Sequence, residues 1–340
     1  MAEPTMSKAA TVPIIGGGPA GMSCALWLAN YGLRPIIIER AAALGGIARD
    51  NPYPNEWFLG RPGETGRENA AAFVHHIEQA GIESRLKTQP VAVRRGTQET
   101  FVLDLTPPTG GAPQSLPCPA LVIATGTSFR GEGWLDSVVN ARALQRRGRV
   151  HLGPTWAGER DADLGSHVAV IGGGDNAFDV SRMLIERGIK ATIVMRAATP
   201  RAQPLLVERL RPLEATGMAQ VMARETVDAL EDTGGRVRLR MRGRRTLDAD
   251  HVLVLFGYEP NSRERWINEL ALAQDPAGYL IVDGNMETSC PGIFAVGDIA
   301  NPVHPCIAAA VGSGAAAGRA IQRRLSAFPS ALAPPPHQAS

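Results

Sequence analysis

Two stretches of the chain share one pattern of apolar and polar positions. In residues 11–40 and 167–196, an apolar run of strand length is followed by a glycine-rich turn, a segment of helical period and a second apolar run. This succession predicts a βαβ unit, which is about 30 residues long. Because the two copies stand far apart along the chain, we expect a duplicated domain architecture rather than a solenoid of short repeats.

The remaining pattern extends this α/β organisation. Apolar runs predict further strands at 120–126, 251–260 and 292–298, and helical periodicity predicts helices at 67–81, 202–216 and 306–325. Pro13 stands inside the first predicted strand, where it can donate no ladder hydrogen bond, so we expect that strand to pair imperfectly at its start. The Pro-rich residues 331–340 are predicted to be disordered.

Length and composition narrow the class of protein. The chain has 340 residues, enough for two domains, and is 44% hydrophobic, as expected for a globular protein. No apolar run approaches the roughly 20 residues that span a bilayer, and the first residues lack the apolar segment of a signal peptide. We therefore expect a cytoplasmic protein without a membrane partner. A net charge of +2 gives no reason to expect nucleic acid as a partner.

The first βαβ unit carries the residues of a dinucleotide site. Gly16, Gly18 and Gly21 form a G-x-G-x-x-G pattern. These glycines permit the tight turn, the approach of a pyrophosphate to the backbone and the packing of helix on strand. Glu39 ends the second strand, where a carboxylate accepts hydrogen bonds from a ribose 2′-hydroxyl. A strand, a glycine-rich turn, a helix and an acid at this spacing together predict a bound dinucleotide.

The second unit predicts a different ribose. Its glycine-rich turn is formed by Gly172, Gly174 and Ala177. The position equivalent to Glu39 is Met195, and Arg196 and Arg201 follow it. A neutral residue flanked by guanidinium groups suits a 2′-phosphate, so we expect NADPH rather than NADH. The alternative is that both arginines are merely solvated, because the chain uses arginine almost to the exclusion of lysine.

Two dinucleotide sites on one chain suggest that one holds FAD and the other a nicotinamide donor. Hydride transfer requires the two rings to stack within about 3.5 Å, which favours a shared scaffold.

Several motifs together resemble the low-molecular-weight thioredoxin reductase family, a branch of the two-domain pyridine nucleotide–disulfide oxidoreductases. They are "IIGGGPAG", "LGGIA", "LVIATG", "VAVIGGG", "FGYEPN" and "TSCPGIFAVGDIA". The resemblance implies two Rossmann-like domains, with an NADPH-binding domain at 129–257 inserted into a discontinuous FAD-binding domain at 1–128 and 258–330. It also implies a homodimer.

Carried over residue by residue, the resemblance implies contacts to both nucleotides. Those to FAD fall on Gly16, Gly18, Pro19, Ala20, Gly21, Glu39, Arg40, Gly45, Gly46, Ile47, Val91, Ala124, Thr125, Gly126, Gly297, Asp298, Cys306 and Ile307. Those to NADPH fall on Gly172, Gly173, Gly174, Asp175, Asn176, Ala177, Arg196, Arg201 and Gly257. The segment 305–314 should place a helix N-terminus at the pyrimidine edge of the flavin, where its N–H groups stabilise the negative charge of the reduced ring.

The sequence departs from disulfide-reducing members of that family at one motif. Their C-x-x-C pair lies shortly before the second glycine-rich turn, where this chain reads "GPTW", residues 153–156. Trp156 either packs against the flavin or is a linker aromatic buried elsewhere. Tyr53 resembles an aromatic residue that stacks on the flavin in thioredoxin-reductase-like ferredoxin–NADP reductases, which also lack the pair. The C-terminal extension of that subgroup is not recognisable here.

The four cysteines are Cys24, Cys118, Cys290 and Cys306, and no two of them form a C-x-x-C pair. Their low number suits a reducing compartment. Cys306 is the one expected near the flavin, either as half of a non-standard redox pair or as a small buried residue. The other three are expected to be structural.

Residues 236–245, "RVRLRMRGRR", alternate arginine with apolar residues and predict a strand with one solvated face. That face is either a docking surface for an acidic electron carrier or, as we favour, an ordinary solvated edge. His75 and His76 have no ligand spacing, so we expect no metal.

These features predict an FAD-dependent NADPH oxidoreductase that passes electrons to an external acceptor, a ferredoxin- or flavodoxin-like carrier or a small molecule. Two alternatives remain at this stage. One is a thioredoxin-like disulfide reductase whose cysteine pair includes Cys306, and the other is a non-enzymatic flavin-binding sensor or partner protein.

Overall fold

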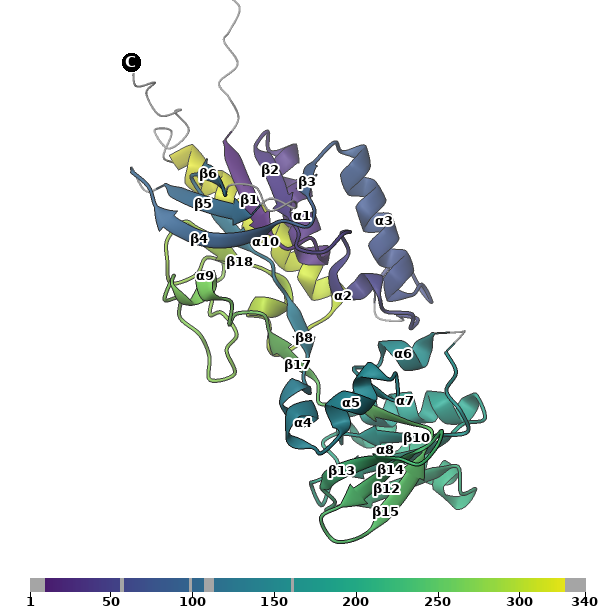
Figure 1. Cartoon of the computed structure of the whole chain (residues 1–340). Helices are drawn as coiled ribbons and strands as arrows, with labels where there is room; N and C mark the ends of the chain where they lie inside the picture. The colour runs from purple at the N-terminus through teal and green to yellow at the C-terminus, as the bar shows by residue number, and fades with distance from the viewer. Residues whose placement is uncertain (1–9, 56–57, 98–99, 107–112, 160–161, 328–340) are drawn as a thin grey trace, which may run out of the picture. The chain divides into compact units, whose positions relative to one another are not determined.

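The chain folds into two compact units, the second inserted into the first. The computed structural model describes residues 10–55, 58–97, 100–106, 113–159 and 162–327. The first unit comprises Met1–Ser128 and Pro260–Ser340, and the second Phe129–Glu259 (Figure 1). The predicted α/β fold with an inserted second unit is confirmed. The Pro-rich residues 331–340 lie outside the described part of the chain.

A parallel sheet forms the centre of the first unit. Its strand order is β18-β7-β1-β2-β3. The strands are β1 (Thr11–Ile15), β2 (Arg34–Ile38), β3 (Glu83–Arg85), β7 (Leu121–Ile123) and β18 (Ile293–Ala295). Four of them, β1, β2, β7 and β18, are nearly continuous apolar runs because both faces of the sheet are covered, whereas the edge strand β3 is polar.

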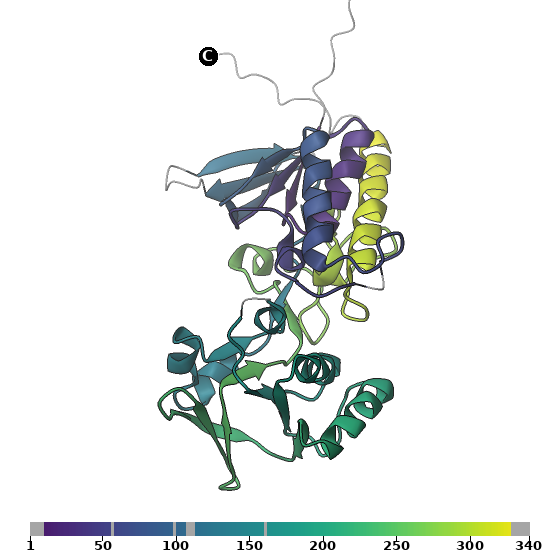
Figure 2. The ribbon, with the colours of Figure 1, turned by 90° about the vertical axis from the view of Figure 1, so that its right-hand side faces the viewer.

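Helices cover one face of this sheet and a second sheet covers the other. Figure 2 shows α1, α3 and α10 side by side on the helical face. The helices of this unit are α1 (Pro19–Asn30), α2 (Gly46–Arg49), α3 (Gly66–Gln79), α9 (Arg265–Asn268), the 3₁₀ helix η1 (Gly297–Ala300) and α10 (Ile307–Ala327). The antiparallel sheet on the opposite face consists of β4 (Gln89–Arg95), β5 (Phe101–Thr106) and β6 (Gln114–Cys118). Phe101 and Leu103 of β5 join Ile36 and Ile38 in one apolar core.

Pro13 disturbs strand pairing on one side only. The strand β1 pairs with β2 in continuous parallel register from Thr11 to Ile15. Its pairing with β7 begins only at Ile14. The expected irregularity at the start of the strand is therefore confined to the β7 side.

The second unit repeats the plan of the first. Its parallel sheet has the order β12-β11-β10-β16-β9. The strands are β9 (Val150–Leu152), β10 (His167–Ile171), β11 (Lys190–Met195), β12 (Ala219–Ala223) and β16 (His251–Val254). Phe178 and Leu184 of α7 (Asp175–Glu186) and Leu210 of α8 (Pro204–Ala215) pack on one face, beside α6 (Thr155–Gly158).

The other face of that sheet carries a second, antiparallel sheet. Its strands are β13 (Val227–Asp232), β14 (Val237–Met241) and β15 (Thr246–Ala249), and the helices α4 (Glu132–Ser137) and α5 (Ala141–Arg146) share their core.

Two paired strands, β8 (Thr127–Phe129) and β17 (Tyr258–Pro260), carry the chain between the units. The prediction of a single strand over 251–260 is wrong. The run is divided into β16 and β17, and Gly257 between them has a φ of +84°, a left-handed conformation that interrupts a strand.

Two candidate nucleotide-binding sites

A pocket of about 360 Å³ lies in the first unit at the carboxyl edge of its parallel sheet. It is lined by the ends of β1, β2, β7 and β18, by the first turns of α1 and α10, and by α2. Open parallel sheets bind ligands at this edge. Of the residues predicted to bind FAD, these line it: Gly16, Gly18, Pro19, Ala20, Glu39, Arg40, Gly46, Ile47, Ala124, Thr125, Gly126, Gly297, Asp298, Cys306 and Ile307.

Two of the three glycines of the G-x-G-x-x-G turn leave no space for a side chain. Gly16 has a φ of +113°, and a Cβ atom there would lie 2.2 Å from the carbonyl oxygen of Ala124. A Cβ atom on Gly21 would lie 2.0 Å from the carbonyl oxygen of Gly16. Helix α1 begins directly after the turn at Pro19, whose missing N–H costs nothing at that position. The free N–H groups of this first turn therefore open on the pocket, as an anion site requires.

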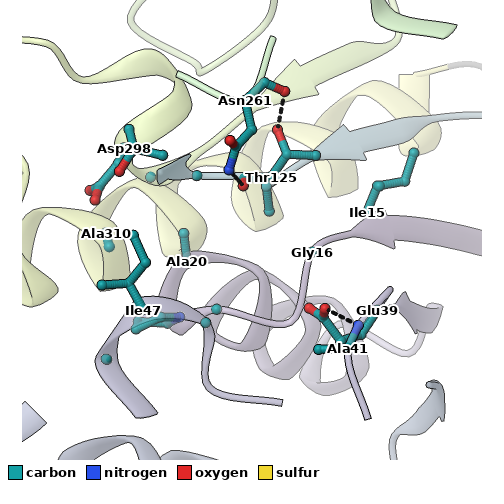
Figure 3. Close-up of a pocket in the computed structure, with 18 of the residues that line it drawn as sticks. Ile15, Gly16, Ala20, Glu39, Ala41, Ile47, Thr125, Asn261, Asp298 and Ala310 are labelled. Carbon is teal, nitrogen blue, oxygen red and sulfur yellow. Dashed lines mark hydrogen bonds between the residues drawn. The ribbon is translucent and has the colours of Figure 1, made fainter. Parts of the chain in front are cut away.

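Two backbone hydrogen bonds fix the orientation of the Glu39 carboxylate at one end of the pocket. The residue is only 9% exposed, and its two carboxylate oxygens accept hydrogen bonds from the N–H groups of Gly17 at 2.8 Å and Ala41 at 2.7 Å. Each oxygen retains a lone pair for a ribose hydroxyl. The bond from Ala41 is drawn in Figure 3.

The opposite end of the pocket, seen in Figure 3, contains Asp298 and the start of α10. Burial raises the pKa of the Asp298 carboxyl to about 6. By its exposed area the residue is half-buried, and a polyhydroxyl chain can supply hydrogen-bonding partners to such a carboxyl. Ile307 begins α10, so the helix N-terminus faces the pocket, and its place at the flavin's pyrimidine edge stays a prediction.

Asn261 was not singled out from the sequence, although it ends the motif "FGYEPN". Its side-chain amide donates to the carbonyl oxygen of Thr125 at 2.8 Å, and its backbone N–H donates to that of Gly126 at 3.0 Å. Figure 3 shows the contact between Asn261 and Thr125. Asn261 thus fastens the turn after β7, which lines the site, to the returning chain.

Four residues predicted for this site lie outside the pocket lining. Gly21 packs behind the turn, and Gly45 precedes α2 with a φ of +117°. Val91 on β4 is 44% exposed, and Thr88 to Pro90 line the pocket in its place. Tyr53 is half-buried two residues beyond Asn51, which does line the pocket, so its stacking on a flavin stays a prediction.

A second pocket, of about 810 Å³, lies at the carboxyl edge of the other parallel sheet. A Cβ atom on Gly172 would lie 2.4 Å from the carbonyl oxygen of Leu255, which reproduces the relation between Gly16 and Ala124. Gly172, Gly173, Arg196 and Arg201 line this pocket, as does Met195 at the end of β11. The structure thus brings both predicted arginines to one cavity beside the glycine-rich turn.

The sequence missed several residues of the second pocket. Trp134 and Phe256 form an edge-to-face pair in its wall, and Thr199, Asp228 and Arg242 line it as well. The predicted residues Gly174, Asp175, Asn176, Ala177 and Gly257 lie outside the lining. Asp175, in the first turn of α7, accepts hydrogen bonds from the backbone and side chain of Gln203, which orders the loop that carries Arg201.

Trp156 packs within the second unit. Its indole stacks on the imidazole of His151, with ring centroids 3.6 Å apart and planes 5° from parallel. The His151 Nε2 atom lies 3.2 Å from Nδ1 of His251, whose Nε2 faces the guanidinium of Arg149 at 3.4 Å. Both contacts involve ring nitrogens of neutral imidazoles, in which one nitrogen donates and the other accepts. Trp156 is thus half-buried against two histidines of its own unit, and a flavin contact stays a prediction.

Gly153, the other end of "GPTW", could not be replaced by cysteine without rearrangement. It has a φ of +76°, and a Cβ atom there would lie 2.4 Å from the ring of Phe129.

All four cysteines have free thiols. Burial raises the pKa of Cys24 and of Cys118 to about 12, so both thiols stay protonated and poorly nucleophilic. Cys290 accepts a contact from Arg95 at 3.2 Å, and Cys306 lines the first pocket. The arrangement offers no specific support for a dithiol that includes Cys306.

The arginine-rich strand is neutralised by neighbouring acids. Five of its guanidinium groups form ion pairs: Arg236–Asp250, Arg238–Asp248, Arg240–Glu231, Arg242–Asp228 and Arg245–Glu225. Because these arginines are paired with carboxylates of the same unit, the surface favours a solvated strand over a docking site for an acidic carrier. Across the described ranges, no cluster of three His, Cys, Asp or Glu side chains could hold a metal ion. None of the helices in that part of the chain could cross a membrane.

Comparisons with known proteins show the family and the fold of the chain. The family model described as "Pyridine nucleotide-disulphide oxidoreductase" matches residues 10–320. A ferredoxin–NADP reductase of Ignicoccus hospitalis is 29% identical over 304 residues, 88% of this chain and 93% of its own. A glucosaminate ammonia-lyase of Pseudomonas fluorescens is 28% identical over 92% of this chain and 95% of its own. The crystal structure of T. acidophilum thioredoxin reductase superimposes with a TM-score of 0.76 at 22% identity, covering 92% of this chain and 97% of that one.

Proposed function

Because the chain belongs to the pyridine nucleotide-disulphide oxidoreductase family and is thereby an FAD-dependent pyridine nucleotide oxidoreductase, we propose that it oxidises NADPH and delivers the electrons to an external acceptor. FAD occupies the first pocket and NADPH the second. The relatives named above carry different activities, so the acceptor is inferred from this chain's own residues.

The first pocket fits FAD from end to end. The carboxylate of Glu39 takes the adenosine ribose, the N–H groups at the start of α1 take the pyrophosphate, and Asp298 takes the ribityl hydroxyls. The N-terminus of α10 faces the flavin ring. When bound, FAD accepts a hydride, two electrons and one proton, from NADPH and releases the electrons one or two at a time.

The assignment of FAD to the first pocket and NADPH to the second rests on the opposite charge of the residues at the two ribose positions. In the first pocket, the carboxylate of Glu39 would repel a 2′-phosphate. In the second, Met195 stands at that position and two arginines, Arg196 and Arg201, line the same cavity. Guanidinium groups bind phosphate through charge-assisted hydrogen bonds, which explains one pocket for FAD and another for a phosphorylated nicotinamide coenzyme.

Electrons leave the flavin without a dithiol relay. The positions of the usual pair are Gly153 and Trp156, and both are packed inside the second unit. The acceptor is therefore one that takes electrons from the flavin directly, a ferredoxin- or flavodoxin-like carrier or a small molecule. We propose further that the protein acts as a homodimer, as the family resemblance implies.

Replacing both arginines, Arg196→Ala with Arg201→Ala, tests the assignment. We expect the KM for NADPH in flavin reduction to rise about tenfold or more, because charge-assisted contacts to the 2′-phosphate are lost, while the KM for NADH changes little. Arg209→Ala, an exposed position on α8, provides the control. Equal effects of the double substitution on both coenzymes would show that the arginines are only solvated.

A further inference from the structure

We propose that Arg242 is a positioning residue for coenzyme choice, an inference that rests on the proposed use of NADPH. Arg242 neutralises Asp228, a carboxylate in the wall of the second pocket. It thereby keeps that pocket able to bind a 2′-phosphate. Asp228 lies on β13 and Arg242 in the turn that follows β14, both more than 25 positions beyond the βαβ motif.

Backbone hydrogen bonds tie this pair to the end of β11. The N–H groups of Arg224 and Glu225 donate to the carbonyl oxygens of Ala197 and Met195, at 3.2 and 3.1 Å. The N–H of Arg242 in turn donates to the carbonyl oxygen of Thr226 at 2.8 Å. The segment that carries Asp228 is therefore fixed beside the residue at the ribose position, and Asp228, Arg242, Arg196 and Arg201 line one cavity.

The ion pair between them is bidentate. The Nη2 and Nε atoms of Arg242 lie 3.0 and 3.3 Å from the two carboxylate oxygens of Asp228. A second carboxylate of the lining, Glu225, is paired with Arg245 through a single contact of 3.2 Å. Both acids of the lining are thus neutralised, which leaves the charge of Arg196 and Arg201 as the net charge facing the ligand.

Charge explains why the pairing of Arg242 with Asp228 affects the binding of a 2′-phosphate more than that of a 2′-hydroxyl. A ribose 2′-phosphate carries a charge of about −1.5 to −2 at neutral pH, whereas a 2′-hydroxyl carries none. An unpaired carboxylate in the same cavity repels the phosphorylated ligand and leaves the unphosphorylated one almost unaffected. Arg242 and Asp228 are both partly exposed, and exposed ion pairs contribute little to folding stability. The pair still changes the charge that a phosphorylated ligand meets in the cavity.

Binding of two adenosine probes to the FAD-loaded protein tests the inference without turnover. We expect Arg242→Ala to weaken adenosine 2′,5′-bisphosphate about three- to tenfold and 5′-AMP by less than about twofold, measured by calorimetry. Arg242→Lys, which keeps the charge, should retain most of the affinity. In the double variant with Asp228→Ala, bisphosphate affinity should return to within about twofold of the Asp228→Ala protein, because no carboxylate is left to repel the ligand.

Arg238→Ala is the matched control. Arg238 lies on β14, forms an equally good bidentate pair with Asp248, and does not line the pocket. It should leave both dissociation constants unchanged.

Two results would overturn the inference: equal weakening of both probes by Arg242→Ala, or no recovery in the double variant. Wild-type protein that binds the bisphosphate no better than 5′-AMP would instead contradict the proposed use of NADPH, and the inference with it.

Discussion

The two pockets differ most at one residue, the end of the second strand in each βαβ unit. Glu39 accepts two backbone hydrogen bonds before any ligand binds, so its orientation does not depend on the ribose. Met195 offers no acceptor, and its side chain instead packs near Gly173. The spacing from the glycine-rich turn is sufficient to find both positions in the sequence, because that distance is set by the length of one helix and one strand.

Other residues of the two sites could not be found from local spacing. Asn261 comes from the chain that returns after the inserted unit, whereas Phe256 follows β16 near the end of that unit and Trp134 comes from α4. Each reaches its pocket only through tertiary packing, for which the sequence has no periodic signal. Arg242 is an example, since the alternation of arginine with apolar residues around it predicts a solvated strand and not a pocket wall.

The histidine cluster beside Trp156 predicts a dependence of stability on pH. Burial, with a contribution from the charge of His251, lowers the pKa of His151 to about 4, against 6.5 for the unperturbed side chain. Between these values the unfolded chain binds a proton that the folded protein does not. The free energy of unfolding should therefore fall as the pH falls from 6.5 towards 4, and be independent of this group above 6.5.

His151→Phe retains an aromatic ring against Trp156 and removes this titration. From pH 7.5 to pH 5, the wild type should lose about 1–2 kcal/mol more stability than the variant in urea unfolding. Some pH dependence should remain, because burial also lowers the pKa of His251. His75→Phe, at an exposed site on α3, serves as the control. Identical pH profiles for His151→Phe and the wild type would contradict the assigned pKa.

At the scale of elements, the close approach of α1 and α10 supports the first pocket. Both helices begin at the pocket, and α10 meets α1 through glycines. A Cβ atom on Gly314 would lie 2.3 Å from the carbonyl oxygen of Ala20 and 2.9 Å from the nitrogen of Cys24, both backbone atoms. Because backbone cannot yield as a flexible side chain can, substitution there must separate the helices.

Gly314→Ala should destabilise the protein by about 1–3 kcal/mol and lower the FAD retained on purification, since the two helix N-termini would move apart. Gly312→Ala on the same helix meets nothing within 4 Å and should be neutral or slightly stabilising, because alanine favours a helix over glycine. Urea unfolding and the flavin content of the purified proteins measure both effects. Equal behaviour of the two variants would show that helix contact does not shape the pocket.

The sequence predicted the long elements better than the short ones. The helices expected at 67–81, 202–216 and 306–325 occur as Gly66–Gln79, Pro204–Ala215 and Ile307–Ala327, because each presents a long apolar stripe. The run at 251–260 predicts one strand because its apolar residues are almost continuous. The turn at Gly257 depends on backbone conformation rather than hydrophobicity, and periodicity does not detect it.

At the scale of the molecule, duplication explains why one chain holds two pockets. Each unit has a five-stranded parallel sheet, a glycine-rich turn fitted against a carbonyl oxygen of a neighbouring segment, and a cavity at the carboxyl edge. The duplication was visible in the sequence because both turns require the same small residues. Different charges at matching positions then give the two pockets different ligands.

The central claim is that one chain holds FAD and accepts hydride from NADPH. The most direct test is to mix the purified, FAD-loaded protein anaerobically with NADPH, and separately with NADH. The yellow flavin absorption is followed in a stopped-flow instrument. We predict that NADPH bleaches the flavin band completely and much faster than equimolar NADH. A protein that does not take up FAD, or whose flavin band is unchanged by NADPH, would contradict the claim.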